Sequence, residues 1–327
     1  KLNQYGKTEA LFQEAKEIQE KTLGKEHPNY AGNLLNLGSI YNITDRHEKA
    51  EQLYLEAKNI YEKTLGNKHP EYAGSLNNLA DIYFQIGQYE KAEPLYLGAK
   101  NIKEKVLGKE HPDHAQTLNN LTSLYAAMGQ YEKAELLVDS TAQIVHTLLT
   151  RAVQFSSEKD LGDFLNQENA NLAHIPSYVL SGHFSDRMTK IAYNDALFQK
   201  GFLQNVARRL NMLTASSPKS DSLAKLLKSY RIRLSKEYTK PIAARHGVPE
   251  LEEKANTIEG SLVRTVAGYA EAMQQVEWAE IQSALQPGEV AIEFLHFPVL
   301  FPKKSDSTMY AALILTPRDT APLFLPL

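Results

Sequence analysis

A pattern of hydrophobic and polar positions repeats along the first 145 residues. Segments of the form Gly-x-x-His-Pro begin at Gly24, Gly66 and Gly108, so the interval is 42 residues. Leucine, tyrosine and alanine columns keep the same interval: Leu37, Leu79 and Leu121; Tyr41, Tyr83 and Tyr125; Ala50, Ala92 and Ala134. A period of about 20–50 residues is typical of a solenoid, in which each repeat buries its apolar face against the next. The pattern therefore predicts a repeat solenoid.

Each period contains two helical segments with a glycine turn between them. In the second period, residues 77–83 and 89–96 have helical spacing, and Gly87-Gln88 forms the turn, as Gly129-Gln130 does one period later. Each period also carries a proline (Pro28, Pro70 or Pro112) that suits the first turn of a helix, because the N–H at that position has no intrahelical partner.

A histidine precedes each of these prolines. His27, His69 and His111 occupy the same loop of successive repeats, so we expect their rings to lie about 10 Å or more apart, the distance between packed helices. Zinc requires its ligands at about 2 Å. We therefore interpret these histidines as structural residues at helix starts and predict no metal site.

The order of large and small residues resembles the tetratricopeptide repeat, in the 42-residue form found in kinesin light chains. The matching positions are Leu37, Gly38, Tyr41, Ala50, Tyr54 and Ala57, then Leu79, Ala80, Tyr83, Ala92, Tyr96 and Ala99, then Leu121, Thr122, Tyr125 and Ala134, before the pattern degenerates at Val138 and Thr141. The resemblance implies about 3.5 repeats over residues 1–145, beginning on the second helix of a repeat.

In such a solenoid the first helix of each repeat lines the concave face. Side-chain amides there offer a donor and an acceptor to the backbone of an extended peptide, and the resembling family holds peptides with such asparagines. The candidate protein- or peptide-binding residues are Asn36, Ser39, Asn77, Asn78, Asp81, Phe84, Asn119, Asn120 and Ser123. The alternative is that these asparagines cap or bridge neighbouring helices.

Residues 146–287 lose the 42-residue period but keep helical periodicity. Apolar stripes over residues 188–213, 223–238 and 251–276 predict three helices, the last two forming a long antiparallel hairpin of coiled-coil type. A basic run on the middle helix comprises Lys225, Lys228, Arg231, Arg233, Lys236 and Lys240. Because these charges surround the helix, a solvated face is favoured over a phosphate-binding stripe.

The character changes again near residue 288. Residues 289–297 and 309–316 read as strands, and residues 321–327 begin another. Residues 278–294, with 310–315 and 322–327, resemble the start of a CHAT domain, the caspase-like module that follows tetratricopeptide repeats in bacteria. Two or three apolar strands do not form a stable two-sided sheet by themselves. We therefore expect more sheet to follow, in the parent protein or in a separate chain.

The composition excludes several classes of function. The 327-residue chain has a formal net charge of −3, 43% hydrophobic residues and no cysteine, so it has no thiol nucleophile of its own. Its charge gives no general attraction for nucleic acid. No apolar run approaches the roughly 20 residues of a membrane helix, and no nucleophile elbow, P-loop or dinucleotide motif is present. We predict no catalytic residue, no cofactor, no membrane contact and a cytoplasmic location.

Together these patterns predict a mainly α protein: a tetratricopeptide solenoid (1–145), a helical or coiled-coil connector (146–287), and the first strands of an α/β caspase-like domain (288–327). The CHAT resemblance implies cysteine proteolysis by a His–Cys dyad, which we assign to none of the ten histidines. The chain is thus expected to be inactive alone and to regulate a protease. Its repeats would sense a protein or peptide trigger, and its connector would relay that event to the rest of the protease domain.

The resemblance also implies a role in bacterial defence, with a nucleic-acid-guided effector complex as a further partner. Two alternatives stay open. One is a non-enzymatic adaptor or scaffold of the kinesin-light-chain type. The other is an RNA-contacting helical module, in which salt-sensitive binding would depend on Lys225, Lys228 and Arg231.

Overall fold

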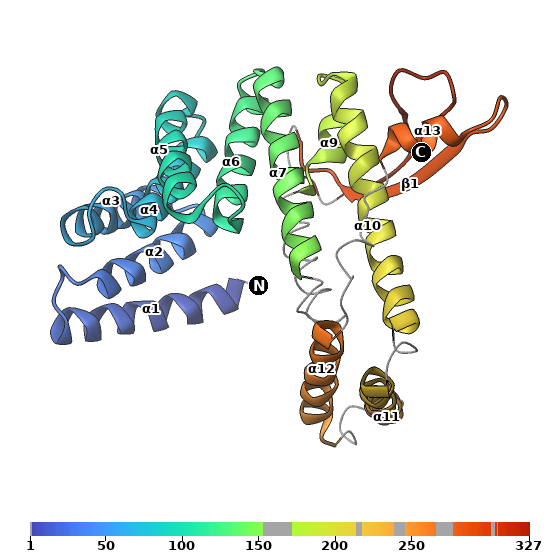
Figure 1. Ribbon diagram of the computed structural model, residues 1–327. Coiled ribbons are helices and arrows are strands. Elements are labelled where there is room, and N and C mark those ends of the chain that lie inside the picture. Colours follow the sequence, from blue (N-terminus) through green and yellow to red (C-terminus); the bar gives the residue numbers. More distant parts are fainter. Residues whose placement is uncertain are drawn as a thin grey trace. The chain divides into compact units, whose positions relative to one another are not determined.

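The computed structural model describes residues 2–152, 172–213, 218–238, 246–265, 277–301, 305 and 307–327. The chain is mainly helical and divides into two compact units, Lys1–Ile144 and Val145–Leu327. Figure 1 labels the helices of both units and strand β1.

The first unit is a solenoid of helix pairs, as the repeat pattern predicts. Its helices are α1 (Leu2–Thr22), α2 (Pro28–Ile43), α3 (His47–Thr64), α4 (Pro70–Gln85), α5 (Tyr89–Leu107), α6 (Pro112–Ala127) and the first part of α7 (Tyr131–Ala152). From α1 to α6, consecutive helices pack against each other (Figure 1). The predicted glycine turns are confirmed, because Gly87 and Gly129 take φ values of 76° and 71°, a left-handed conformation that glycine adopts without strain.

The histidines before the prolines are helix caps, so their predicted structural role is confirmed. In His27, His69 and His111, Nδ1 accepts a hydrogen bond from the backbone N–H two residues later, at 3.1, 3.2 and 3.1 Å. The following proline is the first or second helical residue in each case. Each imidazole therefore satisfies one of the N–H groups that a helix start leaves without a partner.

Small residues let the two helices of a repeat approach closely. Ala50, Ala57, Ala92 and Ala99 are fully buried on the second helices of the first two repeats. Tyr54 is 2% exposed, and its ring lies against Gly38, where an added methyl group would overlap it.

Hydrogen bonds between repeats supplement this packing. The Tyr83 hydroxyl donates to Glu51 at 2.5 Å, and the Tyr125 hydroxyl donates to Glu93 at 3.0 Å. Each bond joins the first helix of one repeat to the second helix of the repeat before it. A lysine of the following helix lies over each tyrosine ring: Lys91 over Tyr83 at 5.3 Å, and Lys133 over Tyr125 at 5.0 Å.

The second unit contains helices α9 (Ile175–Leu180), α10 (Asp186–Leu213), α11 (Pro218–Tyr238), α12 (Val248–Thr265) and α13 (Trp278–Ala284). α11 packs on α12, whereas α10 contacts α9 and α13. Lys225, Lys228, Arg231 and Arg233 are exposed on α11. The end of the third predicted stripe, from Val266 to Val276, lies outside the described residues, as does Lys240.

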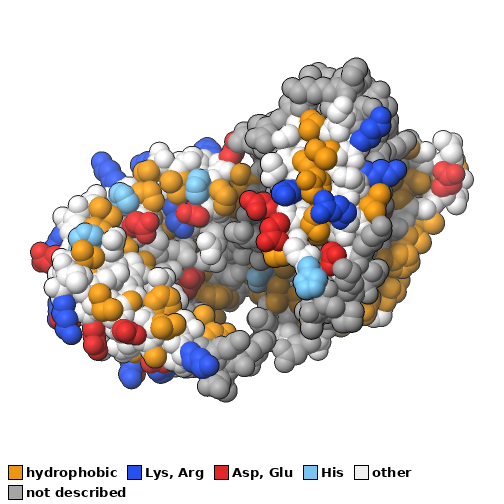
Figure 2. All heavy atoms as spheres, turned by 90° about the horizontal axis from the view of Figure 1, so that it is seen from below, with side chains coloured by type: hydrophobic (Ala, Val, Ile, Leu, Met, Phe, Trp, Pro, Cys, Tyr) orange, Lys and Arg blue, Asp and Glu red, His pale blue; other side chains and the backbone are white. Residues whose placement is uncertain are grey.

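The three C-terminal strands that the sequence predicts are present, and they form an open antiparallel sheet in the order β1-β2-β3. They are β1 (Ala291–Pro298), β2 (Thr308–Leu315) and β3 (Leu323–Pro326). On one face, Leu313 and Leu315 are fully buried. The opposite face is also apolar but exposed: Phe294 is 62% exposed and Leu323 is 59% exposed. In Figure 2, hydrophobic side chains gather at the right-hand edge, where the strands lie.

Gly38 tests the packing between the helices of a repeat. We expect Gly38→Ala to lower the free energy of unfolding by about 1–3 kcal/mol, because the methyl group overlaps the buried Tyr54 ring. Gly74→Ala is the matched control, since nothing lies within 4 Å of the added methyl group. Within α4 it should stabilise the chain by up to about 1 kcal/mol. Chemical unfolding followed by circular dichroism gives both values, and equal effects would contradict this packing.

Tyr83 tests the bonds between repeats. Tyr83→Phe removes the hydroxyl bonded to Glu51 and should cost about 1 kcal/mol of unfolding free energy. Tyr89→Phe removes a hydroxyl for which the described residues provide no hydrogen-bond partner, so its effect should be smaller than about 0.5 kcal/mol. A loss of the same size in both variants, measured by urea unfolding, would show that the Tyr83–Glu51 bond contributes nothing specific.

Candidate functional site

The first helices of the repeats form one continuous face in the solenoid. α2 contacts α4, and α4 contacts α6, although each pair is separated in sequence by a second helix. This places α2, α4 and α6 side by side, as expected for the inner row of a curved solenoid. All nine candidate binding residues belong to these three helices. We call the surface they share the first-helix face.

The nine residues differ in exposure and bonding. Asn36 is exposed, Asn77 is 5% exposed, and the rest are intermediate. Within the described part of the chain, the amides of Asn36, Asn78 and Asn119 have no hydrogen-bond partner. Phe84 stacks in a tilted arrangement with Tyr89, at 5.8 Å between ring centroids.

Asp81 is the centre of a polar cluster on this face. Its Oδ1 accepts hydrogen bonds from the Tyr96 hydroxyl at 2.5 Å and from Asn120 Nδ2 at 3.0 Å. Asn77 Nδ2 lies 3.5 Å from Oδ2, and Asn120 Nδ2 also lies 3.4 Å from Asn77 Oδ1. Because Asn120 belongs to the next repeat, the cluster bridges two repeats. For Asn77 and Asn120 the bridging interpretation of the asparagines is therefore confirmed.

Burial dominates the electrostatics of this cluster. Desolvation raises the pKa of Asp81 to about 6, although the Tyr96 hydrogen bond and the charge of Lys103 act in the opposite direction. Burial and the neighbouring carboxylate together raise the pKa of Tyr96 far above its usual value, so Tyr96 stays a donor at any physiological pH.

The other repeats show how unusual Asp81 is. Serine occupies the equivalent positions: Ser39 shares a 3.1 Å hydrogen bond with the Tyr54 hydroxyl, and Ser123 donates to the Asn119 carbonyl at 3.2 Å. In the first and third repeats, a serine hydroxyl therefore occupies the position of the Asp81 carboxylate. The sequence already contained this signal, because the 42-residue column reads Ser39, Asp81 and Ser123.

Lys103 is a buried cation in the second repeat that the sequence pattern did not predict. It is 5% exposed, and its Nζ donates to the Asp113 carbonyl at 3.2 Å and to the Thr117 hydroxyl at 3.0 Å. Burial lowers the pKa of Lys103, while Asp113 and Asp81 oppose that shift. Tyr61 stands at the equivalent position one repeat earlier, so a break in the repeat columns again marks the site.

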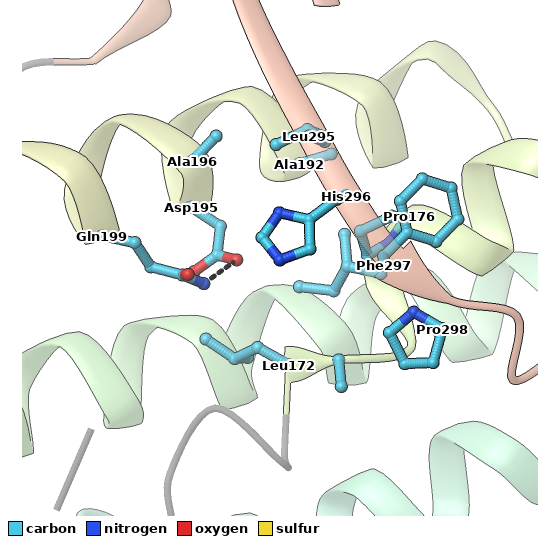
Figure 3. Close-up of a pocket in the computed structure, with 12 residues that line it drawn as sticks. Leu172, Pro176, Ala192, Asp195, Ala196, Gln199, Leu295, His296, Phe297 and Pro298 are labelled. Carbon is cyan, nitrogen blue, oxygen red and sulfur yellow. Dashed lines mark hydrogen bonds between the residues drawn. The ribbon is translucent and has the colours of Figure 1, made fainter. Parts of the chain in front are cut away.

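A second cluster lies in the second unit, around a cavity of about 180 Å³ (Figure 3). Apolar side chains of α9, α10 and β1 form most of its wall, and Asp195, Gln199 and His296 are the polar residues that line it. Asp195 is 7% exposed and accepts from Gln199 Nε2 at 2.8 Å, while its Oδ1 lies 3.2 Å from His146 Nε2. His146 also stacks on Phe198 at 3.9 Å. This cluster was not predicted from the sequence, although Asp195 interrupts an apolar helical stripe.

Comparison with known proteins locates the repeats. The sequence profile of the tetratricopeptide repeat matches residues 1–63, 30–97 and 71–144. Residues 1–144 are tetratricopeptide repeats. In the described ranges, no helix has both the length and the apolar character needed to cross a membrane. No curated protein matches the chain.

Several solved structures are similar to this tetratricopeptide region. BtubC (BKLC) from P. vanneervenii shares 24% identity at a TM-score of 0.41, covering 51% of this chain and 67% of its own. A kinesin light chain of Podosopora anserina with nearly identical TPR-like repeats shares 27% identity at a TM-score of 0.39, covering 52% of this chain and 88% of its own. A point variant of that kinesin light chain shares 27% identity at a TM-score of 0.40, again covering 52% of this chain and 88% of its own.

The raised pKa of Asp81 makes stability depend on pH. The folded state binds this proton more tightly than the unfolded state, so the contribution to stability is complete below about pH 4 and is lost as the pH rises through about 6. Between pH 7 and pH 5, the wild type should gain about 1 kcal/mol relative to Asp81→Ser, the residue of the other repeats.

The difference in pH-dependent stability between wild type and Asp81→Ser reports on Asp81 alone, because both proteins contain all the other titrating groups. His114, whose pKa burial lowers, is one of them. Glu90→Gln, on an exposed carboxylate of α5, is the control and should follow the wild type. If the free energy of unfolding changed equally in wild type and Asp81→Ser between pH 7 and pH 5, the raised pKa of Asp81 would be contradicted.

Proposed function

We propose that the tetratricopeptide region binds an extended peptide segment of a partner protein along the first-helix face. The observation that carries this proposal is that three of the candidate amides have no hydrogen-bond partner among the described residues: Asn36 in α2, Asn78 in α4 and Asn119 in α6. The two other asparagines, Asn77 and Asn120, are engaged within the protein. Asn77 and Asn120 therefore have a structural role, whereas we propose that Asn36, Asn78 and Asn119 contact the ligand.

The chemistry of these amides suits a peptide backbone. Each amide offers one acceptor and two donors, which can bond the N–H and C=O of an extended chain whatever its side chains are. Rigid packing of the helices beneath them lowers the conformational entropy lost on binding. Tetratricopeptide repeats generally bind protein partners, which supports a scaffold or recognition role for residues 1–144.

At a finer level, we propose that the chain is the regulatory segment of a CHAT-type caspase-like cysteine protease in the bacterial cytoplasm. The order of repeats, helical region and strands supports this, as does the resemblance of residues 278–294 to the start of a CHAT domain. The exposed apolar face of the sheet, with Phe294 and Leu323, fits a surface that further structure covers. Residues 1–144 would bind the trigger, and the following helices would transmit binding to the sheet.

Replacing the unpartnered amides tests the binding proposal. Peptides selected from a random display library against the whole chain should bind Asn78→Ala/Asn119→Ala about tenfold or more weakly, since two hydrogen bonds of about 1 kcal/mol each are lost. The matched control is Asn59→Ala/Asn101→Ala, two exposed amides on the second helices α3 and α5. Fluorescence anisotropy gives both affinities. Equal affinities for the two double variants would overturn the proposal.

The protease proposal has a separate test. The coding sequence downstream of the codon for Leu327 should encode a histidine at a strand end and a later cysteine, and the 327-residue chain should cleave no peptide bond by itself. A gene without that pair would favour the adaptor alternative. Specific hydrolysis by this chain would contradict both.

A further inference from the structure

The first-helix face carries negative but no positive side-chain charge. α2, α4 and α6 contain no lysine or arginine, whereas the second helices α3 and α5 contain several lysines. The acidic residues of the three first helices are Glu71, Asp81 and Asp113. Glu71 and Asp113 lie in the first turns of α4 and α6, and Asp81 lies further along α4, within the row of candidate binding residues. Over the solenoid as a whole, both signs of charge are interspersed (left part of Figure 2).

One oxygen of the Asp81 carboxylate is nearly uncommitted. Oδ1 accepts from both Tyr96 and Asn120, while among the described residues Oδ2 has only the long 3.5 Å approach of Asn77. The side chain is thus held in a fixed orientation through Oδ1, and Oδ2 retains acceptor capacity. As a residue, Asp81 is half-buried on the first-helix face.

Packing alone does not require a carboxylate here. The first and third repeats place serine at the same position, and Ser39 bonds Tyr54 as Asp81 bonds Tyr96. Lys103 is the nearby cation, but its Nζ is bonded to the Asp113 carbonyl and to Thr117 rather than to Asp81. Asp81 is therefore a desolvated carboxylate with no directly paired cation among the residues that the structure describes, an arrangement that is often found at binding sites.

We infer that Asp81 selects a lysine or arginine side chain of the bound peptide, with the cationic group donating to Oδ2. This inference rests on the proposed peptide binding and states which peptide side chain the site prefers. A charge-assisted hydrogen bond in a partly desolvated site is stronger than a neutral one. An acidic side chain at the same place would meet a like charge with no basic residue of α2, α4 or α6 to offset it.

The same contact makes binding depend on pH. Asp81 must be ionised to hold a cation, and burial raises its pKa to about 6, so binding should strengthen between pH 5 and pH 7.5. The charged or titratable groups that face it are Tyr54 from α3, with Tyr96 and Lys103 from α5, while α6 presents the uncharged Asn120. The tyrosines stay neutral over this range because burial raises both of their pKa values.

A positional-scanning peptide library tests the inference on the whole chain. Each sublibrary fixes Lys, Arg, Gln or Glu at one position, and fluorescence anisotropy measures binding at pH 5 and 7.5. At one position, Lys or Arg should bind about tenfold more tightly than Gln, and Glu more weakly still. Asp81→Asn keeps a side-chain oxygen that can accept the hydrogen bonds from Tyr96 and Asn120. Asp81→Ser introduces the residue that the first and third repeats have at this position. Both variants should lose the basic preference and its pH dependence, whereas Glu90→Gln should keep them.

The outcomes separate this inference from the proposed function. If no sublibrary binds the wild type, peptide binding itself is wrong. If sublibraries bind but Lys, Arg and Gln are equivalent, peptide binding stands and the Asp81 inference is overturned. A basic preference that survives in both folded Asp81 variants, as verified by circular dichroism, also overturns the inference.

Discussion

A pair of helices cannot bury its apolar side alone, so every repeat of this solenoid depends on the next. Buried tyrosines, alanines, leucines and isoleucines form that contact, and tyrosine–glutamate hydrogen bonds join one repeat to the next. Because α2, α4 and α6 are brought side by side, polar residues 42 positions apart become neighbours on a single surface. The candidate site is thus a consequence of the packing between repeats.

This origin explains why the polar residues of the first-helix face have two different roles. Asn77 and Asn120 join Asp81 across two repeats and so belong to the structure that holds the solenoid together. Asn36, Asn78 and Asn119 lie on the same helices without such bonds to described residues, and they are the residues we propose for peptide contact. Asp81 has both roles in our account: one oxygen joins the repeats, and the other faces a ligand. A mutation at Asp81 therefore has to be judged by specificity and pH dependence as well as by affinity.

The sequence was sufficient where structure depends on local or periodic features. The histidine caps, the glycine turns, the helix pairs and the three strands follow from residue type and spacing, and all of them are found. The Asp81 cluster could not be predicted as a unit, because Tyr96 reaches it only when the two helices of the repeat pack together, and Asn120 only when the next repeat packs on them. Lys103 and the His146–Asp195 pair were missed for the same reason: their partners come from other helices. Breaks in a repeat column, such as serine to aspartate at position 81, were the available signal.

Hydrogen exchange on the whole chain, with and without a peptide selected from the library, tests the central claim most directly. Amide exchange slows where a ligand covers or rigidifies the backbone. Our account predicts that bound peptide protects α2, α4 and α6, with the strongest effect around Asn78, Asp81 and Asn119, and leaves the outer surfaces of α3 and α5 unchanged. Protection confined to α3 and α5, or to the second unit, would contradict it.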